Sequence, residues 1–118
     1  MAGKNKSPEL NAEGRVWITT AEGKFIGKGR IELMEKIKQL GSIRQAAAAM
    51  EMSYRQAWQL IDDMNTRAKT ALVISQRGGK GGGNAVVTKE GQAIIKRFNS
   101  FNQRFQKFLL QEAKKFNL

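Results

Sequence analysis

The sequence predicts a small α+β domain that is mostly helical. Four segments from residue 29 onward carry apolar residues at helical spacing, and two others have the short apolar runs of β-hairpins. With 118 residues the chain is long enough for one compact domain and too short for two. Residues 1–13 are polar and contain the only proline, so we expect a flexible tail there and one domain over residues 14–118.

The first expected element is a β-hairpin over residues 15–29, where two short apolar runs flank a turn near residue 22. In residues 29–41, apolar side chains recur about every three positions and predict an amphipathic helix. Gly41 suits the left-handed end of that helix, and Ser42 can serve as the N-cap of the next one.

Two helices joined by a tight turn are expected next. The first, over residues 43–52, is rich in alanine, so a neighbouring helix can approach it closely. Ser53 resembles the N-cap of the second, over residues 54–69. The expected buried stripe of this second helix consists of Ala57, Leu60, Ile61 and Met64.

A second hairpin and a long helix complete the predicted domain. Residues 71–74 and 85–87 predict strands, joined by the basic loop 77–84, which has five glycines in six positions. Thr88 can cap a last helix over about residues 88–116. Apolar residues recur in it at steps of 4, 3, 4 and 3, a spacing typical of a coiled-coil seam. These residues are Ile94, Phe98, Phe101, Phe105 and Phe108.

This order of elements is the plan of a winged helix-turn-helix, in which the helix after the tight turn enters the major groove of DNA. Recognition is thus assigned to residues 53–67, since Arg can pair with guanine and Gln with adenine. The loop 77–84 is the expected wing, which suits the phosphate backbone or the minor groove. The expected contacts are Ser53, Tyr54, Arg55, Gln56 and Gln59 from the helix, and Arg77 and Lys80 from the wing.

Structural alternatives stay open for these features. The polar side of the recognition helix could equally be an ordinary surface of an all-α bundle, and the glycine-rich loop a disordered hairpin tip. We interpret Trp58 as a core residue rather than a base-stacking platform, because a duplex offers no open base face in its major groove. The loop is not a nucleotide-binding motif, because Gly81 follows Lys80 where Ser or Thr is required.

The composition narrows the class of function. The 21 Lys and Arg against 10 Asp and Glu give a formal net charge of +11, which favours polyanionic partners. The chain has no Cys and no His, so we expect neither a metal site nor an enzyme. No apolar run is long enough for a membrane span, and the first residues lack a signal-peptide core. We therefore expect a cytoplasmic, nucleoid-associated protein.

The apolar seam of the last helix allows two outcomes, packing on its own domain or pairing with a second copy. We expect a homodimer, because the seam extends beyond what so small a domain needs to cover. Two-fold symmetry would place two recognition helices about 34 Å apart on a pseudo-palindromic operator. A helix lying on a membrane is the competing interpretation, given the Lys and Arg residues around the seam. The residues assigned to dimerisation are Phe98, Phe101, Phe105 and Phe108.

Two stretches carry a family resemblance, GRIELMEKIKQLGSIRQAAAAMEMSYRQAWQLIDDMN and RGGKGGGNAVVTKEG. They resemble the N-terminal DNA-binding domain of the ModE family of molybdate-responsive regulators, which is related to the winged helix of LysR-type regulators. The similarity covers about residues 15–110, and its most specific parts are GSI followed by QAA, SYRQAW and MN, and the glycine-rich loop before Thr and EG.

The resemblance implies DNA recognition by the helix from Ser53, phosphate contact by the wing, and dimerisation through the first and last helices. It places Ser42 and Arg44 near the DNA backbone. In the major groove it places Tyr54, Arg55 and Gln56.

The chain also departs from the family pattern. ModE-type proteins bind molybdate in C-terminal domains that follow the matched region, whereas this chain ends at Leu118, so no cofactor is expected. Relatives often carry Lys in place of Arg55 and an acidic residue in place of Ser75-Gln76. These departures leave the target sequence open.

The expected function is therefore sequence-specific binding of double-stranded DNA by a dimeric transcriptional regulator. One alternative is a non-specific, chromatin-like protein that binds DNA by charge alone. A second alternative, from another class, is a small protein that binds an oxyanion such as molybdate.

Overall fold

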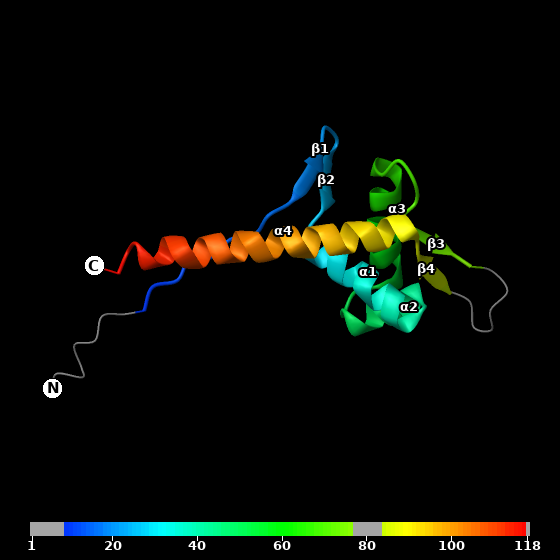
Figure 1. Cartoon of the computed structure of the whole chain (residues 1–118). Helices are drawn as coiled ribbons and strands as arrows, with labels where there is room; N and C mark the ends of the chain where they lie inside the picture. Colours follow the sequence, from blue (N-terminus) through cyan, green and yellow to red (C-terminus); the bar gives the residue numbers. More distant parts are fainter. Residues whose placement is uncertain (1–8, 77–83, 118) are drawn as a thin grey trace.

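The structure, a computed structural model, describes residues 9–76 and 84–117 and has the predicted winged helix-turn-helix plan (Figure 1). A hairpin precedes three helices, and a second hairpin leads into a long last helix. The elements in order are β1 (Ile18–Thr20), β2 (Gly23–Ile26), α1 (Lys28–Leu40), α2 (Ile43–Ala49), α3 (Tyr54–Arg67), β3 (Val73–Ser75), β4 (Ala85–Val87) and α4 (Lys89–Lys114).

The N-terminal hairpin is fixed to the start of α1. Its strands β1 and β2 pair antiparallel, with Ile18 opposite Ile26 and Thr20 opposite Gly23. The ring of Trp17 lies against Gly27, where a Cβ atom would come within 2.2 Å of the ring. A side chain at residue 27 would have to displace the Trp17 ring, so glycine lets the hairpin pack closely against the start of α1.

The caps expected from the sequence are confirmed. Gly41 ends α1 in the left-handed conformation, with φ of +70°. The Oγ atoms of Ser42 and Ser53 accept hydrogen bonds from the backbone N–H groups of Gln45 and Gln56, at 3.1 and 3.0 Å. The α1, α2 and α3 helices bury a common core, to which they contribute Ile31, Leu33, Met34, Ile37, Ile43, Ala46, Ala47, Ala57, Ile61 and Met64.

The second hairpin begins two residues later than the predicted 71–74. The cause is Asn65 on α3, whose Oδ1 accepts from Leu72 N at 2.8 Å and from Val73 N at 3.2 Å, and whose Nδ2 donates to Val73 O at 2.8 Å. These bonds tie the approach to the strand to α3, so pairing with β4 starts only at Val73, opposite Val87.

The junction between β4 and α4 is closely packed. Thr88 Oγ1 donates to Ala71 O at 2.7 Å and accepts from Gly91 N at 3.0 Å, which caps α4 as predicted. A Cβ atom on Gly91 would lie 2.3 Å from Leu72 O. The close approach of these two backbones anchors α4 to the strands of the wing.

The long helix α4 extends well beyond the body, and part of the predicted tail runs beside it (Figure 1). We call residues 9–16 the strap. Gln106 Nε2 donates to Gly14 O at 3.4 Å, and a Cβ on Gly14 would be 3.2 Å from the Phe105 ring. Both contacts are made by Gly14, just after the predicted tail, so the flexible tail over residues 1–13 stays a prediction.

Candidate nucleic-acid interface

The two short turns of the helix-turn-helix bring the N-termini of α2 and α3 to one edge of the molecule. Ser42 is 6% exposed and bridges to Asn84, so its hydroxyl caps α2 in a buried position. Ser53 is exposed and caps α3. Both serines have a structural function here, and their contact with DNA stays a prediction.

Arg44, Tyr54 and Trp58 form a stack that joins α2 to α3. The guanidinium carbon of Arg44 lies 4.2 Å from the centroid of the Tyr54 ring, and the Tyr54 ring meets Trp58 edge to face with centroids 6.4 Å apart. Trp58 is half-buried and packs against the core, as expected. The exposed Arg44 is therefore held in place by a ring that the sequence assigns to the groove.

Three other polar residues near the start of the recognition helix are exposed and available to a ligand. Arg55, Gln56 and Gln59 are exposed on the first turns of α3. Their side chains include donors and acceptors that match the base edges of the major groove. Their assignment to the groove stays a prediction, as does that of Tyr54.

The root of the wing is fixed beside this edge. Ala85 N donates to Gly41 O at 3.0 Å, and Gln76 N donates to Asn84 O at 2.8 Å. The first bond attaches the second hairpin to the junction between α1 and α2, and the second extends the pairing of β3 with β4. Arg77 and Lys80, the two wing residues predicted to contact DNA, lie outside the described residues.

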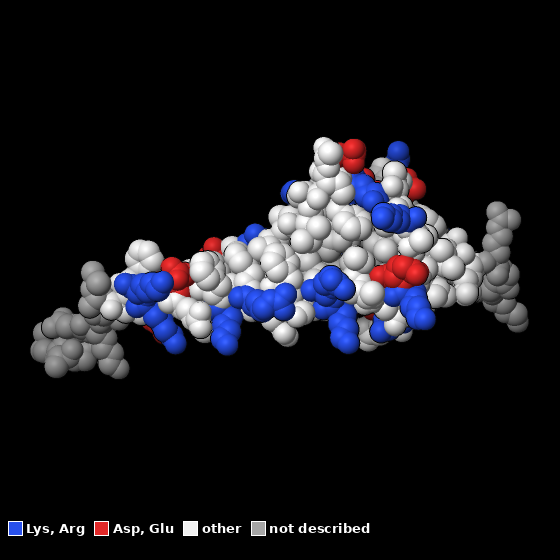
Figure 2. Space-filling model, turned by 45° about the horizontal axis from the view of Figure 1, so that its top comes forward, with Lys and Arg blue, Asp and Glu red and all other residues white. Residues whose placement is uncertain are grey.

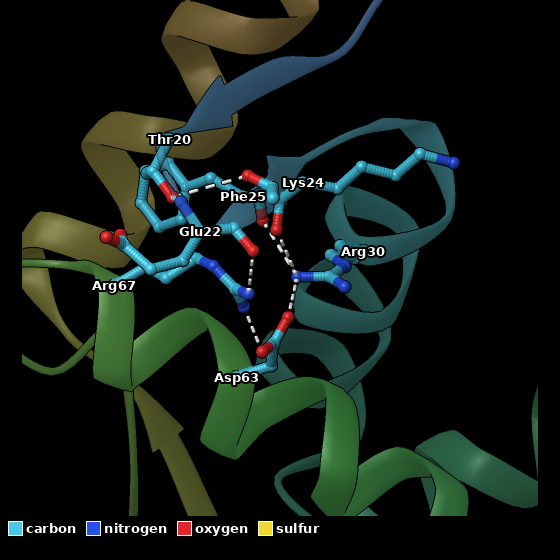
Figure 3. Close-up of polar contacts among 8 residues, drawn as sticks. Thr20, Glu22, Lys24, Phe25, Arg30, Asp63 and Arg67 are labelled. Carbon is cyan, nitrogen blue, oxygen red and sulfur yellow. Dashed lines mark hydrogen bonds and ion pairs between the residues drawn. The ribbon is translucent and has the colours of Figure 1, made fainter.

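A polar network that sequence reasoning missed ties the first hairpin to α1 and α3 (Figure 3). Asp63 on α3 forms ion pairs with Arg67 and with Arg30 Nη1, the latter at 2.6 Å. Arg30 Nη1 also donates to the Lys24 and Phe25 carbonyls at 3.2 Å, and Arg67 Nη2 donates to Glu22 O at 3.1 Å. The sequence offers one clue, the spacing of four between Asp63 and Arg67.

The two arginines also set the charge of Asp63. Partial burial by itself raises the pKa of this carboxyl, but the hydrogen bonds and positive charges of Arg67 and Arg30 outweigh it and hold the pKa below its ordinary value. Asp63 is therefore ionised at neutral pH and fixes the position of the hairpin against α3.

The residues of the predicted seam of α4 are buried to different degrees. Phe98 is 4% exposed, in the core of its own chain, and Phe105 packs beside Gly14 of the strap. Phe101 is half-buried and Phe108 is 54% exposed. The assignment of Phe98 to a dimer interface is thus at odds with its burial, since its ring has almost no free surface.

An open apolar groove lies between the first hairpin and α4. Its floor includes Phe25 and Ile94, and Phe101 forms part of its wall. Ile18, on the hairpin side, is 42% exposed. Arg97 and Arg104 border the groove.

Over residues 9–76 and 84–117, no group of three or more His, Cys, Asp or Glu residues could hold a metal ion. None of the helices described is both long and apolar enough to cross a membrane.

Comparison with known proteins adds a family match. Residues 29–92 match the family of bacterial regulatory helix-turn-helix proteins of the LysR type. The chain is 37% identical over 90 residues to the transcriptional regulator ModE of Yersinia pestis, covering 76% of this chain and 34% of that protein. It is 37% identical over 98 residues to the DNA-binding transcriptional dual regulator ModE of Escherichia coli K12, covering 83% and 37%.

A third relative is the molybdenum transport protein ModE of Azotobacter vinelandii, with 33% identity over 103 residues, which cover 87% of this chain and 38% of the relative. The chain thus spans about a third of the length of these relatives. The matched family region includes α1 to α3, both strands of the wing and the first turn of α4.

Proposed function

The chain belongs to the LysR family of bacterial regulatory helix-turn-helix proteins, and from this premise we propose that it binds specific sequences of double-stranded DNA as a dimer and regulates transcription. The observation that carries this proposal is the edge formed by α2, α3 and the wing root. It presents Arg55, Gln56 and Gln59 on the first turns of a capped helix. A helix that docks by its N-terminal turns reads base edges with these residues.

In this proposal Arg44 contacts a phosphate beside the groove, and Arg77 and Lys80 contact the backbone or the minor groove. Arg55 pairs with a guanine, and the glutamines pair with adenines. Because one relative is named a molybdenum transport protein, control regions of molybdenum-uptake genes are the first operators to test.

Selection of bound duplexes from a random pool, followed by competition at fixed salt, tests sequence specificity. We expect a shared motif with two-fold symmetry. Arg55→Ala should cost about 1–3 kcal/mol and relax the motif at one position, whereas Lys80→Ala should weaken all sequences alike and lower the salt slope by about one. Failure to recover any motif would favour the chromatin-like alternative.

The proposed activity requires no cofactor on this chain. The affinity for the selected duplex should be the same with and without molybdate in the buffer. A change in affinity would place an oxyanion effector site on this chain, as the second alternative requires.

For the dimer, the groove between the first hairpin and α4 offers the interface. Phe101 and the half-exposed Ile18 line it, and the exposed Phe108 lies seven residues beyond Phe101, about 20° away around the helix axis. A second copy related by two-fold symmetry would cover these apolar side chains in both chains at once.

Sedimentation of the double variant Phe101→Asp with Phe108→Asp tests the dimer. We expect a monomer, because four unpaired carboxylates would lie in an apolar interface. The matched control, Gln103→Asp with Gln111→Asp, adds the same charge at exposed positions of the same helix and should stay dimeric. An unchanged mass in the first variant would contradict this interface.

A further inference from the structure

The excess positive charge of the chain is concentrated away from the helix-turn-helix. The recognition helix α3 carries two Arg and two Asp, whereas α4 carries six Lys and Arg against two Glu. Figure 2 shows Lys and Arg side chains in a row along the lower edge of the elongated part of the molecule. Reading of the groove by α3 does not account for these charges on α4.

Four lysines of α4 lie on one side of the helix. They follow each other at steps of 7, 11 and 7 residues, close to two, three and two turns at about 3.6 residues per turn. The four side chains therefore project in nearly the same direction over about 37 Å. This lysine row consists of Lys89, Lys96, Lys107 and Lys114, all exposed.

The lysine row points away from the rest of the molecule. The buried residues Gly91, Ile95 and Phe98 mark the side of α4 that meets the body, and the row lies roughly opposite them around the helix axis. Helix α1 packs against both α4 and α2, so the helix-turn-helix lies on the body side of α4. The row thus faces a different direction from the N-terminus of α3.

The charges of the row are not neutralised within the described residues. There, the only ion pair on or beside α4 joins Lys115 to Glu112. Neighbouring members of the row are about 10–16 Å apart along the helix, at or beyond the screening length of about 8 Å at physiological salt. Each ammonium group is therefore available to an external anion.

We propose that the lysine row is a second surface for DNA, which binds the phosphate backbone of a duplex without regard to sequence. A regular line of cations matches a polyanion of uniform charge density, and its length is close to one turn of B-DNA, about 34–36 Å. Lysines without an apolar or planar partner suit phosphates rather than bases. The duplex bound here is a different segment from the one read by α3, and in that respect the inference rests on the proposed function.

The test compares two variants that remove the same charge. Lys96→Gln with Lys107→Gln shortens the row, and Arg15→Gln with Lys28→Gln removes two exposed cations outside it. Each is titrated with a labelled random-sequence duplex across salt concentrations. Losing two phosphate contacts should lower the salt slope by about 1.8, so a fourfold rise in salt should cost this variant about 12-fold less affinity than the wild type. The control variant should keep the wild-type slope.

A second measurement separates the two surfaces. The protein is first saturated with the unlabelled duplex recovered by selection, and the labelled random duplex is then added. We expect the random duplex still to bind, and to bind more weakly to Lys96→Gln with Lys107→Gln than to the control variant. Loss of random-duplex binding after saturation would overturn the proposal, because it would mean that one surface serves both.

The outcomes distinguish this inference from the proposed function. If selection recovers no motif, sequence specificity fails while the salt slopes still test the row. Equal slopes in the two variants would overturn the row and leave α3 untouched. Binding to vesicles of anionic lipid is measured with the same variants. If the Lys96 and Lys107 substitutions abolished vesicle binding and left the salt slopes for DNA unchanged, the lysine row would be a membrane surface and not a DNA surface.

Discussion

Replacing Tyr54 by leucine should weaken DNA binding by releasing Arg44, and not by removing a base contact. The Tyr54 ring lies 4.2 Å from the guanidinium carbon of Arg44 and meets Trp58 edge to face. An exposed cation–π contact contributes about 0.5–1 kcal/mol and an edge-to-face pair about 0.5–1.5 kcal/mol. Tyr54→Leu removes both, so the free energy of unfolding should fall by about 1–2.5 kcal/mol.

On DNA, the effect comes from the order that the ring imposes on Arg44. A released arginine must be immobilised again on binding, at about 0.5–1.5 kcal/mol, which corresponds to about 2- to 13-fold weaker binding of every duplex. Tyr54→Phe keeps the ring and both of its contacts, so it should bind DNA as the wild type does.

The assay is fluorescence anisotropy at fixed salt, with the selected duplex and a scrambled one. It includes Arg44→Ala and the double variant, because in the absence of Arg44 the change Tyr54→Leu should have no further effect on affinity. If Tyr54→Phe instead reduced the discrimination between the two duplexes, the hydroxyl of Tyr54 would be reading a base, and a positioning role would be refuted.

Three further predictions concern stability, each measured by thermal unfolding. Gly91→Ala should destabilise the protein by about 2–4 kcal/mol, because the new Cβ would meet Leu72 O at 2.3 Å. The control Gly29→Ala, whose new Cβ would have nothing within 4 Å, should stabilise the protein by up to about 1 kcal/mol. Equal effects of the two substitutions would contradict the packing at the wing root. Asp63→Asn should lower the free energy of unfolding by about 1 kcal/mol at pH 7. Because the folded pKa of Asp63 is lowered, the stability that its ion pairs contribute is complete above the ordinary pKa near 4 and is lost as the pH falls through the folded pKa. A difference from wild type that persists unchanged at pH 2 would be inconsistent with the ion pairs. Glu51→Gly should raise stability by up to about 1 kcal/mol, since Glu51 has φ of +55°, and a lower melting temperature would mean that the glutamate side chain stabilises the turn.

Local sequence patterns predict the fold well wherever they determine structure by themselves. Ser42, Ser53 and Thr88 are recognisable as N-caps, and each accepts the expected backbone hydrogen bond. Gly41 is recognisable as a left-handed helix end. In each case the residue type and its position next to an apolar period contain the whole signal.

The sequence could not reveal features that depend on contacts between distant segments. Asn65 delays the start of β3 through bonds to a segment seven or eight residues away, and nothing in its local pattern distinguishes it from a surface asparagine. Gly14 contacts Phe105 and accepts a hydrogen bond from Gln106, which lies 92 residues further along the chain. The same holds for the candidate site, where the sequence singles out both Arg44 and Tyr54 but not their mutual contact.

The last helix shows how one periodic pattern can hold several surfaces. Steps of 4, 3, 4 and 3 predict a single seam, yet its residues are covered to different degrees. Phe98 is 4% exposed and Phe105 packs beside Gly14 of the strap, whereas Phe101 is half-buried at the open groove and Phe108 is 54% exposed. Positions three apart in an α-helix lie about 60° apart around its axis. The two borders of such a stripe can therefore meet different partners. The lysine row occupies a third side of the same helix. Thr88 and Gly91 anchor this helix to the wing. A second copy bound through Phe101 and Phe108 would therefore be connected to the wing by a continuous helix rather than by a flexible linker. The distance between the two DNA-reading edges of the dimer would then follow from the length of α4.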